Sequence, residues 1–394
     1  MTDLQSPLPL MTSEPGSFAR QTIAERKPQI IRQVIEDNPY PAEIVHALQA
    51  FAAEIASHAI QPVKEPAADA SFWNRSLAQF SGATWFEVPW YFAETFFYRR
   101  LLEAVQYFQP GEWNRRDPFR VQKQRQIDAD LRWFSQEWES FGELAPDLAF
   151  EALLHSCLWG NRADLSNFTV KVKALGGTAT ASERQYILVN DTEQAYRLLS
   201  QGMEQIDWVT DNVGKELLFD LALASFLIDQ GWVKRIIFRL KDRPFFVSDA
   251  TIADVHATIA GLRSAAGHTA QATGLRLAEL IASQQIQLTD DPFWTSCLMF
   301  RQFPPNLWED LSSSGLVILK GDVNYRRILD DAHWPHDTRM EEAARYFPAS
   351  FLTLRTLKAE IMIGLQPGQA EKLQAEDPAW LINGKRGLIQ LVIK

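Results

Sequence analysis

The chain has 394 residues, of which 46% are hydrophobic and 22% charged, a composition typical of a globular protein with a sizeable core. Lysine and arginine number 39 against 49 acids, and the net charge of −10 argues against nucleic acid as a partner because phosphate backbones need a basic face. The two cysteines, Cys157 and Cys297, predict neither a disulfide framework nor a zinc motif. Together with the absence of a signal peptide or an apolar run of about 18 to 20 residues, they favour a cytoplasmic protein without a membrane partner.

The N-terminal part of the chain is predicted to be helical. Residues 1–20 are rich in Pro, Ser and Thr and predict an extended arm. Residues 21–175 repeat apolar side chains at helical spacing, as in "IIRQVIEDNPYPAEIVHALQAFAAEI", "YFAETFFYRRLLEAVQYF" and "DLAFEALLHSCLWGN". We expect these helices to form a subdomain that packs on the rest of the chain as a cap.

Beyond this subdomain, short apolar runs alternate with helical patterns. The predicted strands are 185–190, 206–210, 234–240, 316–321, 350–356 and a terminal edge strand at 387–393. This alternation indicates that residues 176–394 form an α/β domain, with a mostly parallel sheet and helices on both of its faces.

Polar side chains follow four of the predicted strands, and the carboxyl ends of parallel strands meet at one edge of a sheet. Asp211, Asn212 and Asp249 offer hard oxygen ligands that suit Mg²⁺ or Mn²⁺. Amide and cationic side chains that can bind phosphoryl oxygens come later in the chain: Asn324, Arg326 and Lys358. A metal ion with a cationic clamp is what phosphoryl transfer requires.

Each of these groups also has an ordinary structural interpretation. Asp211-Asn212 precedes a helix that begins near Gly214, and Ser248-Asp249 precedes "ATIADV", so both pairs match helix N-cap patterns. Arg355 and Lys358 could lie on a solvated face, and Arg355 could also face a structural carboxylate. The sequence holds no P-loop and no GxGxxG motif.

Seven stretches together resemble the metal-dependent damage-control phosphatases, formerly called domain of unknown function 89. They are "TWFEVPWYFAETFFYRRLL", "LWGNRADLS", "ILVNDTEQAYRLL", "DWVTDNVGKELLFDLALA", "PFFVSD", "LKGDVNYRRIL" and "LRTLKAE". The RTxK pattern at residues 355–358 resembles the signature of the sugar-phosphate subfamily, which includes a protein also described as an acidic-residue methyltransferase. The resemblance runs from about residue 20 to about residue 390.

The resemblance implies a three-layer α/β/α sandwich with an N-terminal helical cap and a divalent metal held by Asp211, Asn212 and Asp249. It implies substrate contacts at Lys358 and along the GDVNYR segment. With Asp211 and Asn212, the residues implied to contact the substrate are therefore Asp322, Asn324, Tyr325, Arg326 and Lys358.

The sequence therefore predicts a phosphomonoesterase that depends on Mg²⁺, Mn²⁺, Co²⁺ or Ni²⁺. Its predicted substrates are small phosphorylated metabolites such as fructose 1-phosphate or fructose 6-phosphate, in metabolite damage control. Asp211, Asp249 and Lys358 are the candidate catalytic residues, and Asp211 could either attack phosphorus or only hold the metal. The alternatives are an S-adenosylmethionine-dependent carboxyl methyltransferase, disfavoured because no Gly-rich loop follows the first strand, and a non-catalytic sugar-phosphate-binding protein.

Overall fold

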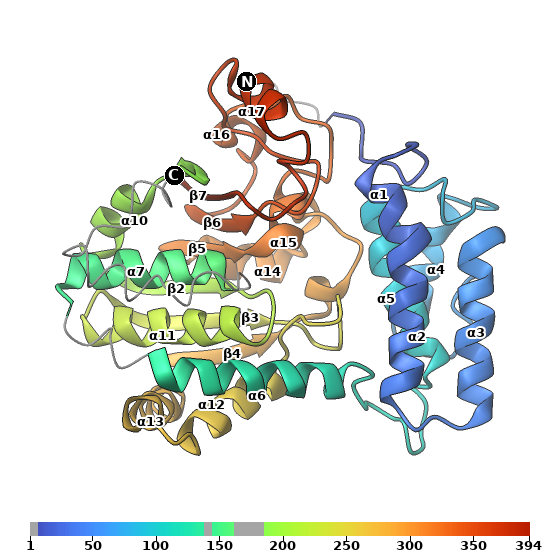
Figure 1. The fold of residues 1–394 in the computed structure, drawn as a ribbon, viewed down its shortest axis with the longest axis horizontal. Helices are drawn as coiled ribbons and strands as arrows, with labels where there is room; N and C mark the ends of the chain where they lie inside the picture. Colours follow the sequence, from blue (N-terminus) through green and yellow to red (C-terminus); the bar gives the residue numbers. More distant parts are fainter. Residues whose placement is uncertain (1–6, 138–143, 161–184) are drawn as a thin grey trace.

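The structure, a computed structural model, describes residues 7–137, 144–160 and 185–394. A seven-stranded sheet with strand order β1-β7-β6-β5-β2-β3-β4 forms the centre of the α/β part (Figure 1). Its strands are β1 (Ile187–Asn190), β2 (Met203–Val209), β3 (Val233–Leu240), β4 (Ile286–Asp290), β5 (Leu316–Lys320), β6 (Phe351–Thr356) and β7 (Gly387–Val392).

The sheet is mostly parallel, as predicted. β6, β5, β2, β3 and β4 run parallel to one another, whereas β7 is antiparallel to β6 and parallel to β1. The last strand was predicted at an edge, which is wrong: β7 lies between β1 and β6. The edge strand β4 was not predicted, because "IQLTD" contains only two aliphatic residues.

Helices cover both faces of the sheet. Along β2 and β5, alternate side chains enter different cores: Trp208 and Ile318 join the core under the helices of one face, and Val209 and Val317 join the other. The first face carries α6 (Arg120–Glu137), α7 (Pro146–Trp159), α10 (Thr192–Leu199), α11 (Lys215–Asp229), α12 (Ile252–Arg263) and α13 (His268–Ala282). The second carries η4 (Pro292–Thr295), η5 (Phe300–Gln302), α14 (Pro305–Ser312), α15 (Gly321–Ile328), α16 (Met340–Ala343) and α17 (Gln369–Glu376).

The N-terminal helices form a cap that stands beside the sheet rather than over either face (Figure 1). Their core is rich in aromatic side chains that include Trp85, Phe96 and Phe97, and it also takes in Phe245 and Val247 from the loop after β3. The cap elements are α1 (Phe18–Gln21), η1 (Thr22–Arg26), α2 (Lys27–Asp37), α3 (Ala42–Ser57), α4 (Ala70–Ala78) and α5 (Trp90–Ala104). The predicted boundary between subdomains, at residues 175 and 176, lies outside the described residues and stays a prediction.

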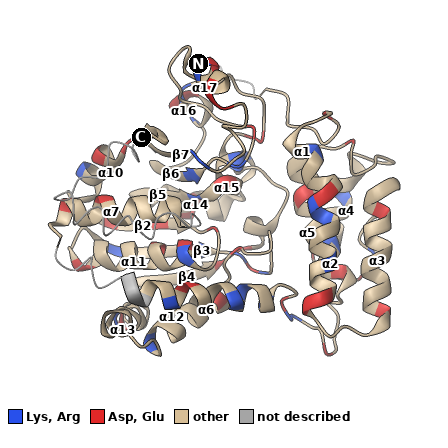
Figure 2. Cartoon of the chain, in the orientation of Figure 1, with Lys and Arg blue, Asp and Glu red and all other residues tan. Residues whose placement is uncertain are grey.

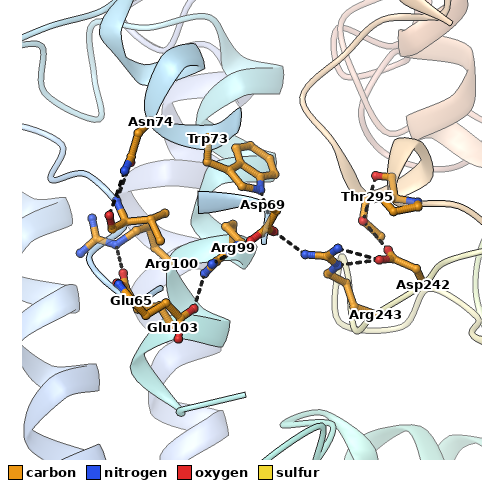
Figure 3. Close-up of polar contacts among 12 residues, drawn as sticks. Glu65, Asp69, Trp73, Asn74, Arg99, Arg100, Glu103, Asp242, Arg243 and Thr295 are labelled. Atoms are coloured by element: carbon orange, nitrogen blue, oxygen red, sulfur yellow. Dashed lines mark hydrogen bonds and ion pairs between the residues drawn. The ribbon is translucent and has the colours of Figure 1, made fainter. Parts of the chain in front are cut away.

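A chain of ion pairs ties the cap to the α/β part (Figure 3). Arg243, which follows β3, contacts Asp69 of the cap and Asp242 of its own loop. Arg99 of α5 donates two hydrogen bonds to the same Asp69, at 2.9 and 3.0 Å, and Thr295 donates to Asp242. Because these groups are largely buried, the contacts hold the two parts in a defined orientation.

Charged residues of both signs are interspersed along the helices and strands (Figure 2). No helix in the described ranges combines the length and apolar character that a membrane crossing requires.

Candidate functional site

A cavity of about 180 Å³ lies between the cap and the ends of the strands. The cap contributes Phe18, Arg26, Trp90 and Glu94 to its wall. The α/β part contributes four acids, an amide and an exposed lysine, among other residues: Asp211, Asn212, Glu216, Asp249, Asp322 and Lys358. The structure therefore brings Asp211, Asn212, Asp249, Asp322 and Lys358 together around one cavity, and their roles as metal ligands or substrate contacts stay predictions.

Backbone pairing brings the first two predicted metal ligands next to the third. The segment after β2 pairs with the loop after β3: Ala250 N donates to Asp211 O at 2.8 Å, and Val213 N donates to Ser248 O at 2.7 Å. The loop reaches this position through two non-glycine residues with positive φ, Phe246 at 45° and Val247 at 70°. Such strain persists only where the surroundings hold it, and it concentrates at functional sites.

The acid–amide pair after β2 does not cap the helix that follows. The N-cap of α11 is Gly214, and Asp130 of α6 accepts the hydrogen bond from Lys215 N at 2.9 Å instead. The side chains of Asp211 and Asn212 are thereby left free to face the cavity.

Asp249 does not serve as a helix N-cap either. The N-cap of α12 is Thr251, which forms a capping box with Asp254. Asp249 instead lies in the wall of the cavity.

The acids at the cavity repel one another. Burial raises the pKa of Asp211 well above its ordinary value, and the charges of Glu216 and Asp249 raise it further. Asn212 Nδ2 partly relieves the repulsion by donating to Asp211 Oδ2 at 2.9 Å and to Glu216 Oε1 at 3.1 Å. Ser248 donates to Asn212 Oδ1 at 2.5 Å, which fixes the orientation of the amide.

Asp249 is 1% exposed and forms an ion pair with the buried Lys241 at 3.1 Å. Burial raises the pKa of Asp249, although Lys241 opposes the shift. Lys241 also donates to Thr210 O at 3.1 Å, so it ties Asp249 to the end of β2.

Gly321 allows the chain after β5 to approach Asp211. Its φ is +82°, and a Cβ at this position would lie 1.9 Å from Asp211 Oδ2. Only glycine satisfies both the backbone conformation and the close contact. The preceding Lys320 is 1% exposed, pairs with Asp220 at 2.9 Å and donates to the carbonyl of Cys157.

The GDVNYR segment forms helix α15, and most of its side chains point elsewhere than the cavity. Asp322 lines the cavity and accepts hydrogen bonds from Arg326 at 2.8 Å and Arg355 at 2.7 Å. Burial raises the pKa of Asp322, but Arg355 and Arg326 outweigh it, and the net pKa is lowered. Arg355 thus faces a structural carboxylate, one of the two alternatives that the sequence left open.

The structure does not place Asn324, Tyr325 and Arg326 in the cavity wall. Arg326 is fully buried, stacks on Trp90 at 3.7 Å and pairs with Asp331 as well as Asp322. Asn324 donates to the carbonyls of Thr210 and Lys320, and Tyr325 accepts from Ile363 N. Their geometry is that of residues that position the loops, and their contact with a substrate stays a prediction.

Four charged residues of the cavity wall were not predicted from the sequence. Glu216 could have been found, because it lies in the first turn of α11, four residues after Asn212. Lys320 directly precedes Gly321, but a lysine that ends a strand gives no signal of burial. Arg26 and Glu94 come from the cap, and only the tertiary packing brings them to the strand ends.

The chemistry of the predicted ligands suits a divalent cation. Within the described ranges, no group of three or more His, Cys, Asp or Glu side chains is arranged to hold a metal ion. The predicted set, however, combines the carboxylates of Asp211 and Asp249 with the amide of Asn212, and Glu216 adds a further carboxylate beside it. Buried, mutually repelling oxygen donors fit a hard cation, because its charge would remove the repulsion.

A known protein family matches most of the chain, including the acidic residues of this cavity. Residues 22–373 match the damage-control phosphatase ARMT1-like domain, and the chain belongs to that family. The family is metal-dependent.

The relatives extend over nearly the whole chain. The chain is 32% identical to damage-control phosphatase ARMT1 of Danio rerio, over 95% of this chain and 94% of that protein. It is 30% identical to damage-control phosphatase ARMT1 of Homo sapiens, over 98% of both. A crystal structure of a DUF89 family protein from Pyrococcus horikoshii shares the fold, with a TM-score of 0.52 and 12% identity over 95% of this chain and 97% of that chain.

Proposed function

We propose that the chain is a divalent-metal-dependent phosphomonoesterase that hydrolyses small sugar phosphates. One observation carries the proposal: three buried acids, Asp211, Glu216 and Asp249, meet in a cavity that also exposes Lys358. The buried acids attract a cation, and the exposed lysine attracts an anion such as a phosphoryl group. The relatives named as damage-control phosphatases support phosphate-ester hydrolysis as the reaction.

In this proposal Asp211, Asn212 and Asp249 hold the metal, with Glu216 beside them. The ion, when bound, supplies a Lewis acid for the phosphoryl group. Lys241 holds Asp249 in place, and the glycine at 321 leaves room for the carboxylate of Asp211. Mg²⁺, Mn²⁺, Co²⁺ and Ni²⁺ all suit these oxygen donors.

Lys358 supplies positive charge to the phosphoryl oxygens as charge develops on them. It is exposed at the cavity, and its positive charge opposes the rise in the pKa of Asp211, which supports a position within electrostatic reach of that carboxylate. Asp211 either attacks phosphorus itself or only holds the metal while a water molecule attacks. The RTxK pattern supports a place in the sugar-phosphate branch of the family, with fructose 1-phosphate and fructose 6-phosphate as candidate substrates in metabolite damage control.

The test is a phosphate-release screen over sugar phosphates, with each of the four metals and with EDTA. We expect release from at least one fructose phosphate that requires a divalent metal. Release from none of the sugar phosphates under any metal would refute the proposal. Asp211→Asn serves as the inactive control, because it keeps the shape of the side chain.

A further inference from the structure

The wall of the cavity that faces away from the strand ends comes from the cap. Glu94, in the first half of α5, lines this wall next to Trp90 and Arg26, although it is only 2% exposed. A carboxylate so deeply buried costs free energy unless both of its oxygens are satisfied.

One oxygen of Glu94 is held by Lys27. This lysine is fully buried, pairs with Glu94 Oε1, and lies over the rings of Phe97 at 4.7 Å and Tyr98 at 4.9 Å. It begins α2 directly after η1, the π-helical segment Thr22–Arg26. Single π-helical turns are often found at functional sites. Lys27 therefore acts as a positioning residue that orients the carboxylate.

The other oxygen, Glu94 Oε2, is buried and has no hydrogen-bond partner among the described residues. An ionised carboxylate can only accept hydrogen bonds, so a group that satisfies Oε2 must be a donor. A fully ionised phosphate monoester has no proton to donate, so it cannot satisfy this oxygen. The hydroxyl group of a sugar is a donor of suitable size and charge.

We propose that Glu94 is a specificity-determining residue that accepts a hydrogen bond from a hydroxyl group of the substrate. The inference rests on the proposed function, since it assumes that the phosphoryl group sits at the acids and Lys358. The substrate then spans the cavity, with its anionic end at the strand ends and a hydroxyl at the cap. Phosphate esters without hydroxyl groups leave Glu94 Oε2 without a partner.

The experiment compares kcat/KM for fructose 1-phosphate, fructose 6-phosphate and p-nitrophenyl phosphate, which has no hydroxyl group, in the metal-loaded enzyme. Glu94→Gln should lower kcat/KM for the preferred fructose phosphate about tenfold, because a neutral acceptor binds a hydroxyl less strongly than an ionised one. Lys27→Met with Glu94→Leu replaces the buried pair by apolar groups and should lower it by about 10- to 100-fold. In both variants p-nitrophenyl phosphate should stay within about threefold of wild type.

Glu65→Gln is the matched control. Glu65 is also a buried cap carboxylate, pairs with Arg99 at 2.8 Å and is not part of the cavity wall, so the variant should alter no substrate preference. An equal loss for sugar phosphate and p-nitrophenyl phosphate, or no loss for either, in the Glu94 variants would overturn the role of Glu94 while leaving the phosphatase intact. A wild-type protein that hydrolyses neither kind of ester would instead refute the proposed function, and this inference with it.

Discussion

Replacing Gly321 by alanine should disable the site without unfolding the protein. The added Cβ would lie 1.9 Å from Asp211 Oδ2, whereas real Cβ atoms essentially never approach another heavy atom within 3.0 Å. The carboxylate or the loop must therefore move by at least about 1.1 Å, the difference between these distances. A misplacement of about 1 Å in a catalytic constellation can lower turnover about 100-fold.

The substitution also carries a backbone cost. Gly321 has a φ of +82°, and an L-residue in this region loses about 1–2 kcal/mol of stability. Gly231→Ala is the matched control, because Gly231 has a φ of +70° and no atom within 4 Å of the added Cβ. Gly231→Ala should lose about 1–2 kcal/mol in denaturant unfolding, and Gly321→Ala should lose at least as much, because its Cβ also displaces a neighbour. Only Gly321→Ala should lose turnover, measured as phosphate release. Equal turnover in the two variants would refute the reasoning that Gly321 makes room for Asp211.

Three further predictions concern Lys358 at the cavity and two groups outside its wall, Asp220 and Cys297. Lys358→Ala should lower kcat/KM for sugar phosphates by about 10- to 200-fold, because one charge-assisted hydrogen bond to the substrate is lost. Metal affinity, measured by calorimetry, should stay intact. An unchanged kcat/KM would make Lys358 an ordinary surface lysine. Asp220→Ala should cost about 3–5 kcal/mol in urea unfolding, because the buried Lys320 loses its partner; a cost below about 1 kcal/mol would contradict this. Burial raises the pKa of Cys297 to about 11 from 9.0, so at pH 8 its thiolate fraction falls about 100-fold. Iodoacetamide should label native Cys297 slowly at pH 8 and faster as the pH rises toward 11, and rapid labelling at pH 8 would refute the shift.

The fold was largely predictable because most strands carry a strong apolar signal. β2, β3, β5 and β6 each have a run of buried aliphatic or aromatic side chains, and the helices between them require parallel connections. β4 was not predicted, because an edge strand needs fewer apolar residues and therefore gives a weaker apolar signal. β7 was misplaced because the sequence does not indicate which neighbour a final strand pairs with.

The meeting of polar side chains at the strand ends was predictable because the strands that precede them are parallel. Parallel strands deliver Asp211 and Lys358 to one edge whatever the details of packing. Whether a side chain there faces the cavity depends on tertiary contacts that the sequence does not reveal. Arg326 is an example. The sequence predicts that it binds the phosphate, but its side chain is buried between two aspartates and the ring of Trp90.

The cap half of the site could not be predicted. Glu94 lies more than a hundred residues before Asp211 in the chain, and its helix reads as an ordinary amphipathic segment. Its role depends on the orientation of the cap, which the ion pairs of Arg243 fix only in the folded protein (Figure 3).

The central claim is that the buried acids at the ends of β2 and β3 hold a divalent ion needed for phosphate-ester hydrolysis. The most direct test titrates Mn²⁺ into wild type and Asp249→Asn, and measures bound metal and phosphate release from fructose 1-phosphate or fructose 6-phosphate in the same samples. We expect wild-type turnover to follow the fraction of protein with bound Mn²⁺, and we expect the variant to lose metal affinity together with at least about 100-fold in turnover. Undiminished turnover in excess EDTA, or full turnover in a folded Asp249→Asn protein, would contradict it.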